Sequence, residues 1–350
     1  MLFDFALPRA TSVTALTTAT VALRTLPLNM NASDRYLFEP AIRNEIAPSQ
    51  LLQLDGVTAL ANGWLYQQFT LLKESFVDVR QPSKSRQLKT IPKRVTAGLS
   101  AEKIERGVWI TDNWSRNYFH WLTDAIPRLY LAKQHDPNVD LLLPSFYQSI
   151  SYTKQSLEPF MLGSVNIIPE DRAIFVKKFS IPTYSADTGN YNESVIRSIG
   201  DTYRSHYGAS APVGRRIYVS RSKAPVRKVE NEDQILPVLA RHGFEIVHCE
   251  NMTFSEQVKI FSESCMMAGP HGAGFVNMMF MHPEAKILEI HPRDTKINNC
   301  YFSMASAFKH SYFYMLSDTS SRDLPSHLNS MIIDVDELDK NLSLLCACQP

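Results

Sequence analysis

Residues 265–274 read CMMAGPHGAG. Four apolar or small residues are followed by three glycines within six positions, which predicts a short buried strand that ends in a glycine turn. A helix is expected from this turn to Met281, and a further strand at residues 286–290. Strand, helix and strand in this order form the βαβ unit of a parallel sheet, so the stretch predicts an α/β fold.

The same alternation continues around this stretch. Strands are expected at residues 216–219 and 244–248, and helices at residues 231–242, 253–264 and 298–309. Two of the helix starts carry cap residues, Asn231 with Gln234 and Thr253 with Glu256, whose side chains can satisfy free amides of a first turn. The second half of the chain therefore predicts a complete parallel α/β domain.

The first half of the chain has a similar alternation of strands and helices, but only after about residue 100. Strands are expected at residues 108–110, 140–143, 166–168 and 173–176, and helices at residues 116–135, with a kink at Pro127, and 149–162. Before about residue 100 the strands are short, with Asp-Gly and Asn-Gly turn signals at residues 55–56 and 62–63. This pattern predicts a first α/β domain with a β-rich N-terminal segment.

A stretch rich in Gly, Ala, Ser and Pro, residues 208–214, has the composition of a linker. We therefore expect a β-rich segment of the first domain at residues 1–100, the first domain at 101–207, the second at 215–315, and a tail at 316–350 that packs back on the first domain. Two domains of similar size predict a cleft between them.

Composition limits the classes of function. A chain of 350 residues with 44% hydrophobic and 20% charged residues is long and apolar enough for about two globular domains. Its 36 Lys and Arg nearly balance 35 Asp and Glu, so no overall field attracts nucleic acid, and an anionic ligand needs a local cluster. No signal peptide and no run of about 18 apolar residues are visible, which predicts at most peripheral membrane contact.

The first candidate group is Asn117, His120 and Asp124. On a helix these residues lie at i, i+3 and i+7, so they share one face. A histidine and a carboxylate one turn apart can orient each other, and either can take a proton from an attacking hydroxyl. The alternative is a solvated surface pair, with Trp121 and its apolar neighbours forming the core.

The second candidate group follows the strand expected at residues 216–219. Ser220 and Arg221 stand at its carboxyl end, which is where parallel sheets bind ligands, and Arg227 comes soon after. Two arginines can clamp a diphosphate through charge-assisted hydrogen bonds. A solvated basic loop is the alternative reading.

The third candidate group is the glycine turn itself. Gly272, Ala273 and Gly274 let the backbone approach a ligand at a helix N-terminus, and His271 adds a side-chain donor. Glu289 ends the next strand, where a carboxylate can accept hydrogen bonds from ribose hydroxyls. A plain tight turn and a carboxylate satisfied by neighbouring amides are the alternatives. The turn matches neither GxGxxG nor a Walker loop, which disfavours dinucleotide and P-loop enzymes.

Three ordered motifs resemble glycosyltransferase family 61, over about residues 50 to 340. They comprise residues 117–124 with Pro127 and Arg128; residues 218–221 with Arg227, Asn231 and Glu232; and residues 269–274 with Asn277. Members of this family transfer xylose, arabinose or N-acetylglucosamine from UDP-sugars, and bacterial members accompany capsule or surface polysaccharide synthesis. Lys228 stands where a second arginine is frequent, and the residues before about 50 match no part of the family pattern.

The resemblance implies a GT-B fold of two Rossmann-like domains that face a cleft, anomeric inversion, and no cofactor or essential metal. It implies UDP-sugar binding on the second domain, by Ser220, Arg221, Arg227, His271, Gly272, Ala273, Gly274, Asn277 and Glu289. Asp124 would be the general base, with His120 as rival or orienting partner and Asn117 and Trp121 in acceptor or supporting roles. The acceptor would be an oligosaccharide or a lipid-linked glycan.

Two sequence features are poor candidates for metal sites. Asp334, Val335 and Asp336 have the DxD form of another glycosyltransferase fold, but they stand at the chain end, where Asp336 is better interpreted as a helix cap. Cys346 and Cys348 form a lone CxC without a second ligand pair, and five cysteines in all predict a reducing compartment. No HExxH motif is present, so no metal is expected.

Two classes of function remain open from sequence. The first is the inverting, metal-independent transferase of polysaccharide synthesis, and the second is a catalytically silent nucleotide-sugar or glycan-binding component of a polysaccharide assembly complex. The N-terminal membrane anchor of animal and plant relatives is not visible, so we expect a bacterial, cytoplasmic protein, with at most peripheral contact with the inner face of the cell membrane.

Overall fold

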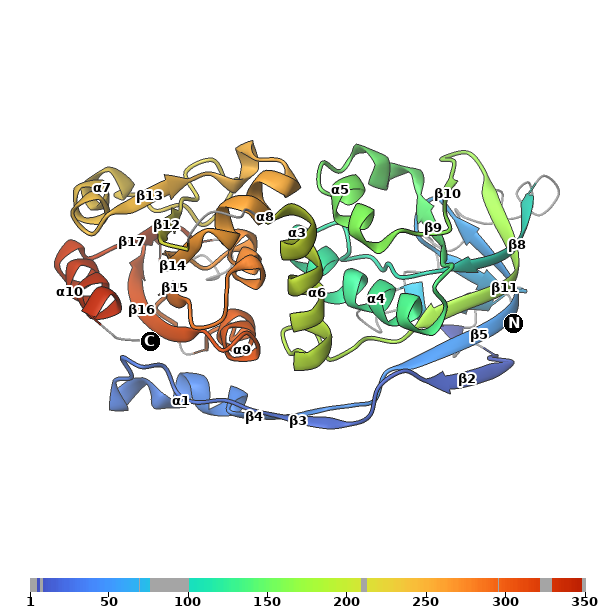
Figure 1. Cartoon of the computed structure of the whole chain (residues 1–350), viewed down its shortest axis with the longest axis horizontal. Coiled ribbons are helices and arrows are strands. Elements are labelled where there is room, and N and C mark those ends of the chain that lie inside the picture. Colours follow the sequence, from blue (N-terminus) through green and yellow to red (C-terminus); the bar gives the residue numbers. More distant parts are fainter. Residues whose placement is uncertain are drawn as a thin grey trace. The chain divides into compact units, whose positions relative to one another are not determined.

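The computed structural model describes residues 5–6, 9–68, 70–75, 101–208, 213–294, 296–321 and 329–347. The chain divides into two compact units (Figure 1). Unit 1 is Met1–Thr20 with Ala47–Ala186, and unit 2 is Val21–Ile46 with Asp187–Pro350. The division therefore falls near residue 186, before the linker expected at residues 208–214, of which residues 209–212 lie outside the described part.

The sheet of unit 2 has six strands, in the order β13-β12-β14-β15-β16-β17. Their bounds are β12 Arg215–Val219, β13 Phe244–Val247, β14 Ser264–Pro270, β15 Lys286–Pro292, β16 Ser311–Thr319 and β17 Met331–Ile332. The first five strands along the chain pair in parallel, and β17 pairs antiparallel with β16. This is the doubly wound order in which the strand sequence reverses between β12 and β14, the place where such sheets bind ligands.

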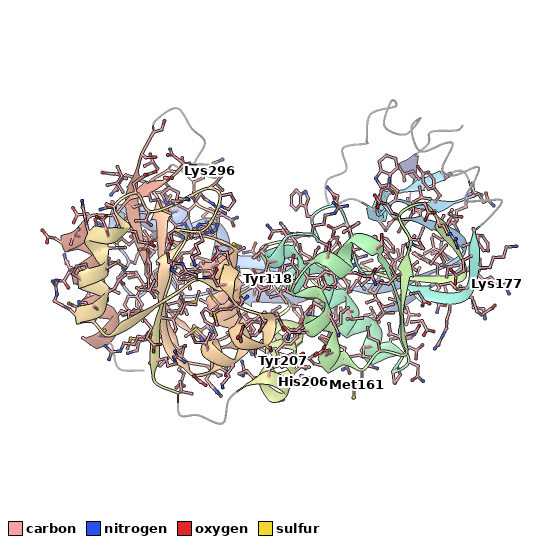
Figure 2. The ribbon with its side chains drawn as sticks, turned by 90° about the horizontal axis from the view of Figure 1, so that it is seen from above. Tyr118, Met161, Lys177, His206, Tyr207 and Lys296 are labelled. Carbon is pink, nitrogen blue, oxygen red and sulfur yellow. The ribbon has the colours of Figure 1, made fainter. Side chains whose placement is uncertain are left out.

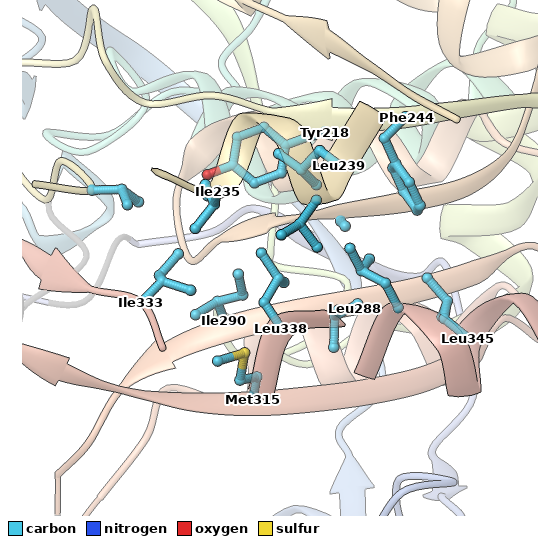
Figure 3. Close-up of a cluster of buried hydrophobic side chains, with 14 of the residues drawn as sticks. Tyr218, Ile235, Leu239, Phe244, Leu288, Ile290, Met315, Ile333, Leu338 and Leu345 are labelled. Carbon is cyan, nitrogen blue, oxygen red and sulfur yellow. The ribbon is translucent and has the colours of Figure 1, made fainter. Parts of the chain in front are cut away.

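Helices α7 (Glu232–Arg241) and α10 (Val335–Ala347) cover one face of this sheet with apolar side chains (Figure 3). Tyr218 and Leu288 from the strands pack with Leu239 of α7 and Leu338 of α10. Every second residue of a strand points to the same face, so the alternate residues, Glu289 among them, face the other side. The remaining elements of unit 2 are α6 Glu193–Tyr207, η7 Cys249–Asn251, α8 Phe254–Ser262, η8 Ala273–Phe280 and α9 Cys300–Ala307.

The C-terminal helix belongs to unit 2. We expected residues 316–350 to pack on the first domain, but Leu338, Leu342 and Leu345 of α10 are fully buried in the core of unit 2. The expected cap was Asp336, whereas Asp334 caps the helix, because its Oδ1 accepts from Glu337 N at 2.9 Å. Apolar spacing at every third and fourth position therefore decided where this tail packs.

Residues 21–46 also belong to unit 2, although they precede the first domain in the chain. Asn29 Nδ2 donates to the carbonyl of Tyr314 at 2.7 Å, and the hydroxyl of Tyr314 donates to Asp34 at 2.7 Å. Phe38 is fully buried, with Tyr314 at a ring distance of 4.9 Å. The segment contains β3 Thr20–Leu23, η1 Ala32–Asp34, α1 Arg35–Phe38, η2 Glu39–Ala41 and β4 Arg43–Ile46. Its expected place in the first domain was wrong.

Helix α6 joins unit 2 through a close contact with η8. A Cβ on Gly200 would lie 2.5 Å from the carbonyl of Met279, so only glycine allows this approach. Tyr203 packs edge to face on Phe254 and Phe280 at ring distances of 5.0 and 5.6 Å. This packing explains why the domain boundary precedes α6 instead of following it.

Unit 1 has a nine-stranded sheet, in the order β1-β7-β6-β5-β11-β8-β9-β10, with β2 beside β5. The bounds are β1 Phe5–Ala6, β2 Ser12–Ala15, β5 Gln50–Leu60, β6 Leu65–Gln67, β7 Thr70–Leu72, β8 Glu102–Val108, β9 Asp140–Pro144, β10 Ser164–Ile168 and β11 Ala173–Pro182. Strands β8 to β11 pair in parallel in the order β10-β9-β8-β11, half of a Rossmann sheet. Its order reverses between β8 and β11.

The N-terminal strands of unit 1 agree in part with the sequence. The Asn-Gly signal at residues 62–63 is a hairpin turn between β5 and β6, and Gly63 has a φ of +88° there. The Asp-Gly signal at residues 55–56 lies inside β5, which continues through it along β11. Residues 76–100 lie outside the described part, and with them the end of the expected β-rich segment.

The helix predicted at residues 116–135 forms in three pieces. It begins at α3 (Tyr118–His120), widens into the π-helical turn η4 (Trp121–Ala125), and continues as α4 (Ile126–His135). Pro127 lies in the first turn of α4, where the missing N–H costs little. Such π turns often mark functional sites. The remaining helical elements of unit 1 are η3 Lys73–Ser75, η5 Ser145–Ser149, α5 Thr153–Leu157 and η6 Glu158–Phe160.

Within the described residues, no helix combines the length and the apolar character that crossing a membrane requires. The cytoplasmic location expected from the sequence stays a prediction.

The packing of α10 predicts a difference between two leucines of that helix. Leu338→Ala should lower the free energy of unfolding by about 2–5 kcal/mol, because it leaves a cavity in the core of unit 2. Leu344→Ala, at a side chain that is 46% exposed, should change it by less than about 0.5 kcal/mol. Urea unfolding of both variants measures the difference, and equal losses would contradict the packing described for α10.

Candidate functional site

The basic loop after β12 is fixed by Ser220. Its hydroxyl is buried, donates to Glu232 Oε1 at 2.7 Å, and accepts from the backbone N–H of Ser222 at 3.1 Å. Ser220 therefore ties the loop to the first turn of α7. We predicted a donor-binding role for it, but its hydrogen bonds make it a support of the loop.

Arg221 and Arg227 bring two cationic side chains together in this loop. Arg221 Nε donates to the carbonyl of Arg227 at 3.1 Å, and Nη2 to that of Val226 at 2.9 Å. Burial and the charge of Arg227 lower the pKa of Arg221 to about 10, so its guanidinium stays charged at neutral pH. Neither arginine forms an ion pair with a carboxylate among the described residues.

Arg227 combines an unfavourable backbone conformation with a buried side-chain donor that has no described partner. Its backbone has a φ of +57°, a conformation that costs a non-glycine residue energy. Its side-chain Nε is buried and has no hydrogen-bond partner among the described residues. A buried cationic donor without an acceptor is costly unless a ligand supplies one.

The guanidinium of Arg221 lies against the backbone of Gly272. A Cβ at Gly272 would stand 1.9 Å from Arg221 Nη1, so a larger residue would displace the side chain. The turn also packs on the end of β12, because a Cβ at Gly269 would lie 2.8 Å from the carbonyl of Val219. The structure thus brings Arg221 beside the turn of residues 269–274, at the point where the strand order reverses.

Ala273 and Gly274 are the first two residues of η8, a helix whose N-terminus carries partial positive charge. A Cβ at Gly274 would lie 3.0 Å from Val219 Cγ1, which is tight. Both residues follow directly on Gly272, the glycine that Arg221 contacts, and their predicted role in receiving an anion stays a prediction.

Glu289 has a different place from the one we expected. It is fully buried, with Oε1 2.5 Å from His271 Nδ1, and Oε2 accepting from the hydroxyl of Tyr312 at 2.7 Å. Burial alone would raise the pKa of Glu289, but His291 and His271 outweigh it and the pKa falls to about 2. The carboxylate is fully buried and both of its oxygens accept hydrogen bonds, so in this structure Glu289 positions His271. Its contact with ribose hydroxyls stays a prediction.

Asn277 also faces the interior. It is fully buried in η8, and its Nδ2 donates to Gln257 Oε1 of α8 at 2.8 Å. We expected it to bind the donor, but a side chain without exposed surface supports η8 instead.

The sequence did not reveal Tyr301 of α9. Its ring lies 5.0 Å from the ring of His271 and 5.6 Å from that of Phe275, and it is almost completely buried. Burial raises the pKa of its hydroxyl well above the usual value, so Tyr301 is neutral. It packs behind the glycine turn from a segment 30 residues further along the chain, which local patterns do not indicate.

In unit 1, His120 and Asp124 form the pair that their spacing predicted. His120 Nδ1 donates to Asp124 Oδ2 at 2.8 Å, across the π turn η4. Their side chains are 19% and 3% exposed, so the histidine is the member that reaches solvent. Its other ring nitrogen, Nε2, makes no hydrogen bond to a described residue. The partly exposed imidazole is thus held by a buried carboxylate, and the assignment of the general base to Asp124 or His120 stays a prediction.

Arg128 holds the strand ends around this pair. Its buried guanidinium donates from Nε to the carbonyl of Pro182 at 2.7 Å and from Nη1 to that of Ile110 at 2.8 Å. Pro182 ends β11, and Ile110 follows β8, so one side chain joins the two strands between which the order reverses. Arg128 belongs to the first family motif, but no local pattern predicts this role for it.

Asp112 lies at the same strand ends and was also missed. Its Oδ2 accepts from the hydroxyl of Tyr184 at 2.6 Å, and Oδ1 from the backbone N–H of Trp114 at 2.7 Å. Asp112 stands four residues beyond β8, a position that could have been read as a ligand-binding end of a parallel strand. Its hydrogen bonds fix the loop that carries Trp114, whose ring lies 4.9 Å from that of His120.

Asn117 and Trp121 have supporting roles. The side chain of Asn117 caps α3 by accepting from Phe119 N at 2.9 Å. Trp121 is fully buried and donates from Nε1 to Ser156 Oγ at 2.8 Å. Tyr118, next to Asn117, packs edge to face on Tyr152 at 4.9 Å, and Figure 2 labels its position.

Among the described residues, one group of three places metal-ligand atoms within 4.8 Å of one another: His271, Glu289 and His291. These atoms already bond among themselves and to Tyr312, whose hydroxyl lies 3.2 Å from His291 Nε2. In this network His271 Nδ1 and His291 Nε2 are hydrogen-bond donors, so each nitrogen carries a proton on the side of the carboxylate. A protonated ring nitrogen has no lone pair for a metal, so these atoms do not fit a metal ligand set. The thiol of Cys346 lies 4.0 Å from Met266 Sδ. Cys348, the other cysteine of the CxC pair, lies outside the described part.

A mainly apolar cavity of about 580 Å³ lies elsewhere in unit 1, among β9, β10 and α5. Leu143, Leu157 and Ile167 line it, whereas His120 and Asp124 do not. Met161, just before the lining residue Leu162, projects from the surface with 81% exposure (Figure 2). The cavity is therefore separate from the polar groups at the strand ends.

Comparison with known proteins finds a family match that spans both groups of residues. Residues 118–288 match the family model of glycosyltransferase 61. This match supports a glycosyltransferase. It contains His120, Asp124, the arginine loop and the glycine turn, and it is shorter than the expected range of about residues 50 to 340.

One curated relative is the EGF domain-specific O-linked N-acetylglucosamine transferase of Drosophila melanogaster. It is 32% identical over 94 residues, which are 26% of this chain and 18% of the relative. The chain thus matches less than a fifth of the length of this relative.

The contact between Arg221 and Gly272 predicts the effect of one methyl group. Gly272→Ala should weaken pyrophosphate binding about 10-fold or more, because the displaced guanidinium loses a charge-assisted hydrogen bond. The fold should survive, since a flexible side chain can move away. Isothermal titration calorimetry measures the affinity, with Gly214→Ala as the control, since a Cβ there meets no atom within 4 Å. Unchanged affinity in Gly272→Ala would remove this contact from the anion site.

Proposed function

We propose that this chain is an inverting glycosyltransferase that moves a sugar from a UDP-sugar to a glycan hydroxyl. One observation carries the proposal: Arg227 Nε is buried and has no hydrogen-bond partner among the described residues. It belongs to the same loop as Arg221, whose guanidinium contacts Gly272. It supports a site built for an anion at a switch point of a parallel sheet. The family match over residues 118–288 supports sugar transfer as the reaction.

In this proposal Arg221 and Arg227 bind the diphosphate of the donor, near the N-terminus of η8. Their positive charge stabilises the negative charge that develops as the UDP leaves, so no metal is required for that purpose. Xylose and N-acetylglucosamine are the first donor sugars to test. The name of the Drosophila relative favours N-acetylglucosamine as the transferred sugar, and so UDP-N-acetylglucosamine as the donor.

The acceptor is activated in unit 1 in this proposal. A hydroxyl of an oligosaccharide or lipid-linked glycan gives its proton to His120 Nε2 while its oxygen attacks the anomeric carbon, and the bond to the UDP oxygen breaks. One displacement inverts the anomeric centre. Asp124 holds the imidazole and stabilises its positive charge, as a carboxylate does in hydrolase triads. A GT-B arrangement of the two units, and a place in bacterial capsule or surface polysaccharide synthesis, are part of the proposal.

The second candidate function is a silent nucleotide-sugar or glycan-binding component of a polysaccharide assembly complex. Its sites would bind the same ligands, so binding alone does not separate the two functions. Transfer does: saturating UDP-sugars with a range of glycan acceptors should give product, and UDP binding without any transfer would favour the silent component.

The donor site is tested first by Arg221→Ala. UDP affinity should fall about 10- to 100-fold, because a charged hydrogen bond contributes roughly 1.5–3 kcal/mol. The measurement is calorimetric titration with UDP, and Lys223→Ala, an exposed charge in the same loop, is the matched control. Equal effects of the two changes would indicate a general charge effect instead of a diphosphate site.

The roles of His120 and Asp124 are tested by His120→Gln, Asp124→Asn and the double variant. Each single change should lower turnover about 100-fold or more and leave UDP affinity unchanged, since both act on the acceptor proton. The double variant should lose little beyond the worse single variant, because the pair acts as a unit. A far larger loss in Asp124→Asn than in His120→Gln would return the role of base to Asp124.

A further inference from the structure

Glu289 and His271 form a second pair in which a buried carboxylate holds a histidine. The carboxylate is fully buried and the histidine side chain is 13% exposed, with Oε1 and Nδ1 2.5 Å apart. Glu289 lies on β15, in the strand next to β14, so the sheet register places it behind the glycine turn. The hydroxyl of Tyr312 satisfies its other oxygen.

The geometry leaves one ring nitrogen of His271 for a ligand. Nδ1 donates a hydrogen bond to Glu289, and the backbone N–H of His271 donates to the carbonyl of Ile290 at 2.9 Å. These two bonds fix both the side chain and the backbone of His271. Nε2 makes no hydrogen bond to a described residue. A neutral imidazole that donates from Nδ1 carries a lone pair at Nε2, and that atom can take up a proton.

Burial opposes the protonation of His271, and two neighbouring cationic groups add to its effect. Burial lowers the pKa of His271, and Arg227 and His291 lower it further, against the opposing effect of Glu289. The titratable and charged groups packed around the ring are Glu289 and His291 of β15, Tyr301 of α9, Tyr312 of β16, and Arg221 and Arg227 of the loop after β12. A bound anion would cancel the repulsion from Arg227.

We propose that binding of a nucleoside diphosphate is coupled to the uptake of one proton at His271 Nε2, with Glu289 as the positioning residue. The proton comes from solvent, and the imidazolium then donates to a phosphate oxygen while Glu289 balances its charge. This inference rests on the proposed diphosphate site. It makes His271 a third cation of that site, one that appears only with the ligand and stabilises the leaving diphosphate.

Proton uptake is measured by titrating the full chain with UDP in two buffers of different ionisation enthalpy. About pH 8 is suitable, because a terminal phosphate with a second pKa of about 6 is already deprotonated there. The wild type should take up protons, at most one per UDP, and its affinity should fall as the pH rises. Binding without proton uptake would overturn the inference.

Three variants separate the coupling from general effects. His271→Asn should abolish the uptake and weaken UDP binding about 10-fold, while binding through Arg221 persists. Glu289→Gln keeps the shape and an acceptor for Nδ1 but removes the charge, so uptake should shrink. His248→Asn removes a neighbouring histidine, 3.5 Å from Ser222, and should leave the uptake unchanged.

The outcomes distinguish this inference from the proposed function. If UDP binds through Arg221 but His271→Asn changes neither affinity nor proton uptake, the coupling is wrong and the donor site stands. If Glu289→Gln does not fold, the pH dependence of wild-type affinity and the His271→Asn variant still decide. If UDP does not bind the wild type at all, both proposals fall.

Discussion

The contact of the Arg221 guanidinium with the backbone of Gly272 is the constraint on which the arrangement of the arginine loop and the glycine turn depends. It requires β12 and β14 to be neighbours, because each strand delivers one of the two partners from its carboxyl end. It requires glycine at position 272, since a Cβ would collide with the guanidinium. The same loop holds Arg227 with its side-chain Nε buried and without a partner among the described residues. In the function proposed above, a bound anion supplies the missing acceptor.

In unit 1, Arg128 holds the strand ends together. This side chain joins the carbonyls that follow β8 and end β11, and so fixes the place where the strand order of that sheet reverses. The π turn beside it aligns His120 with Asp124. Each unit thus presents a partly exposed histidine backed by a buried carboxylate, an arrangement that sets which ring nitrogen is left for chemistry.

Local sequence patterns predicted what depends on neighbours in the chain. Strand and helix alternation in unit 2, the capping box of Thr253 with Glu256, and the pairing of His120 with Asp124 all follow from spacing. Asn231 shows the limit: its side chain exchanges hydrogen bonds with the backbone of Ile333 instead of capping α7. Contacts between distant segments, such as residues 21–46 on β16 or Glu289 behind His271, depend on packing that no local pattern contains.

In the function proposed above, the strand ends of β12 and β14 form a diphosphate site. The most direct test compares the affinities of uridine, UMP and UDP for the wild type over a range of salt concentrations. With a diphosphate site there, UDP should bind tightest and uridine weakest, and the advantage of UDP should shrink as salt screens the charges. Equal affinities for uridine and UDP, independent of salt, would contradict it.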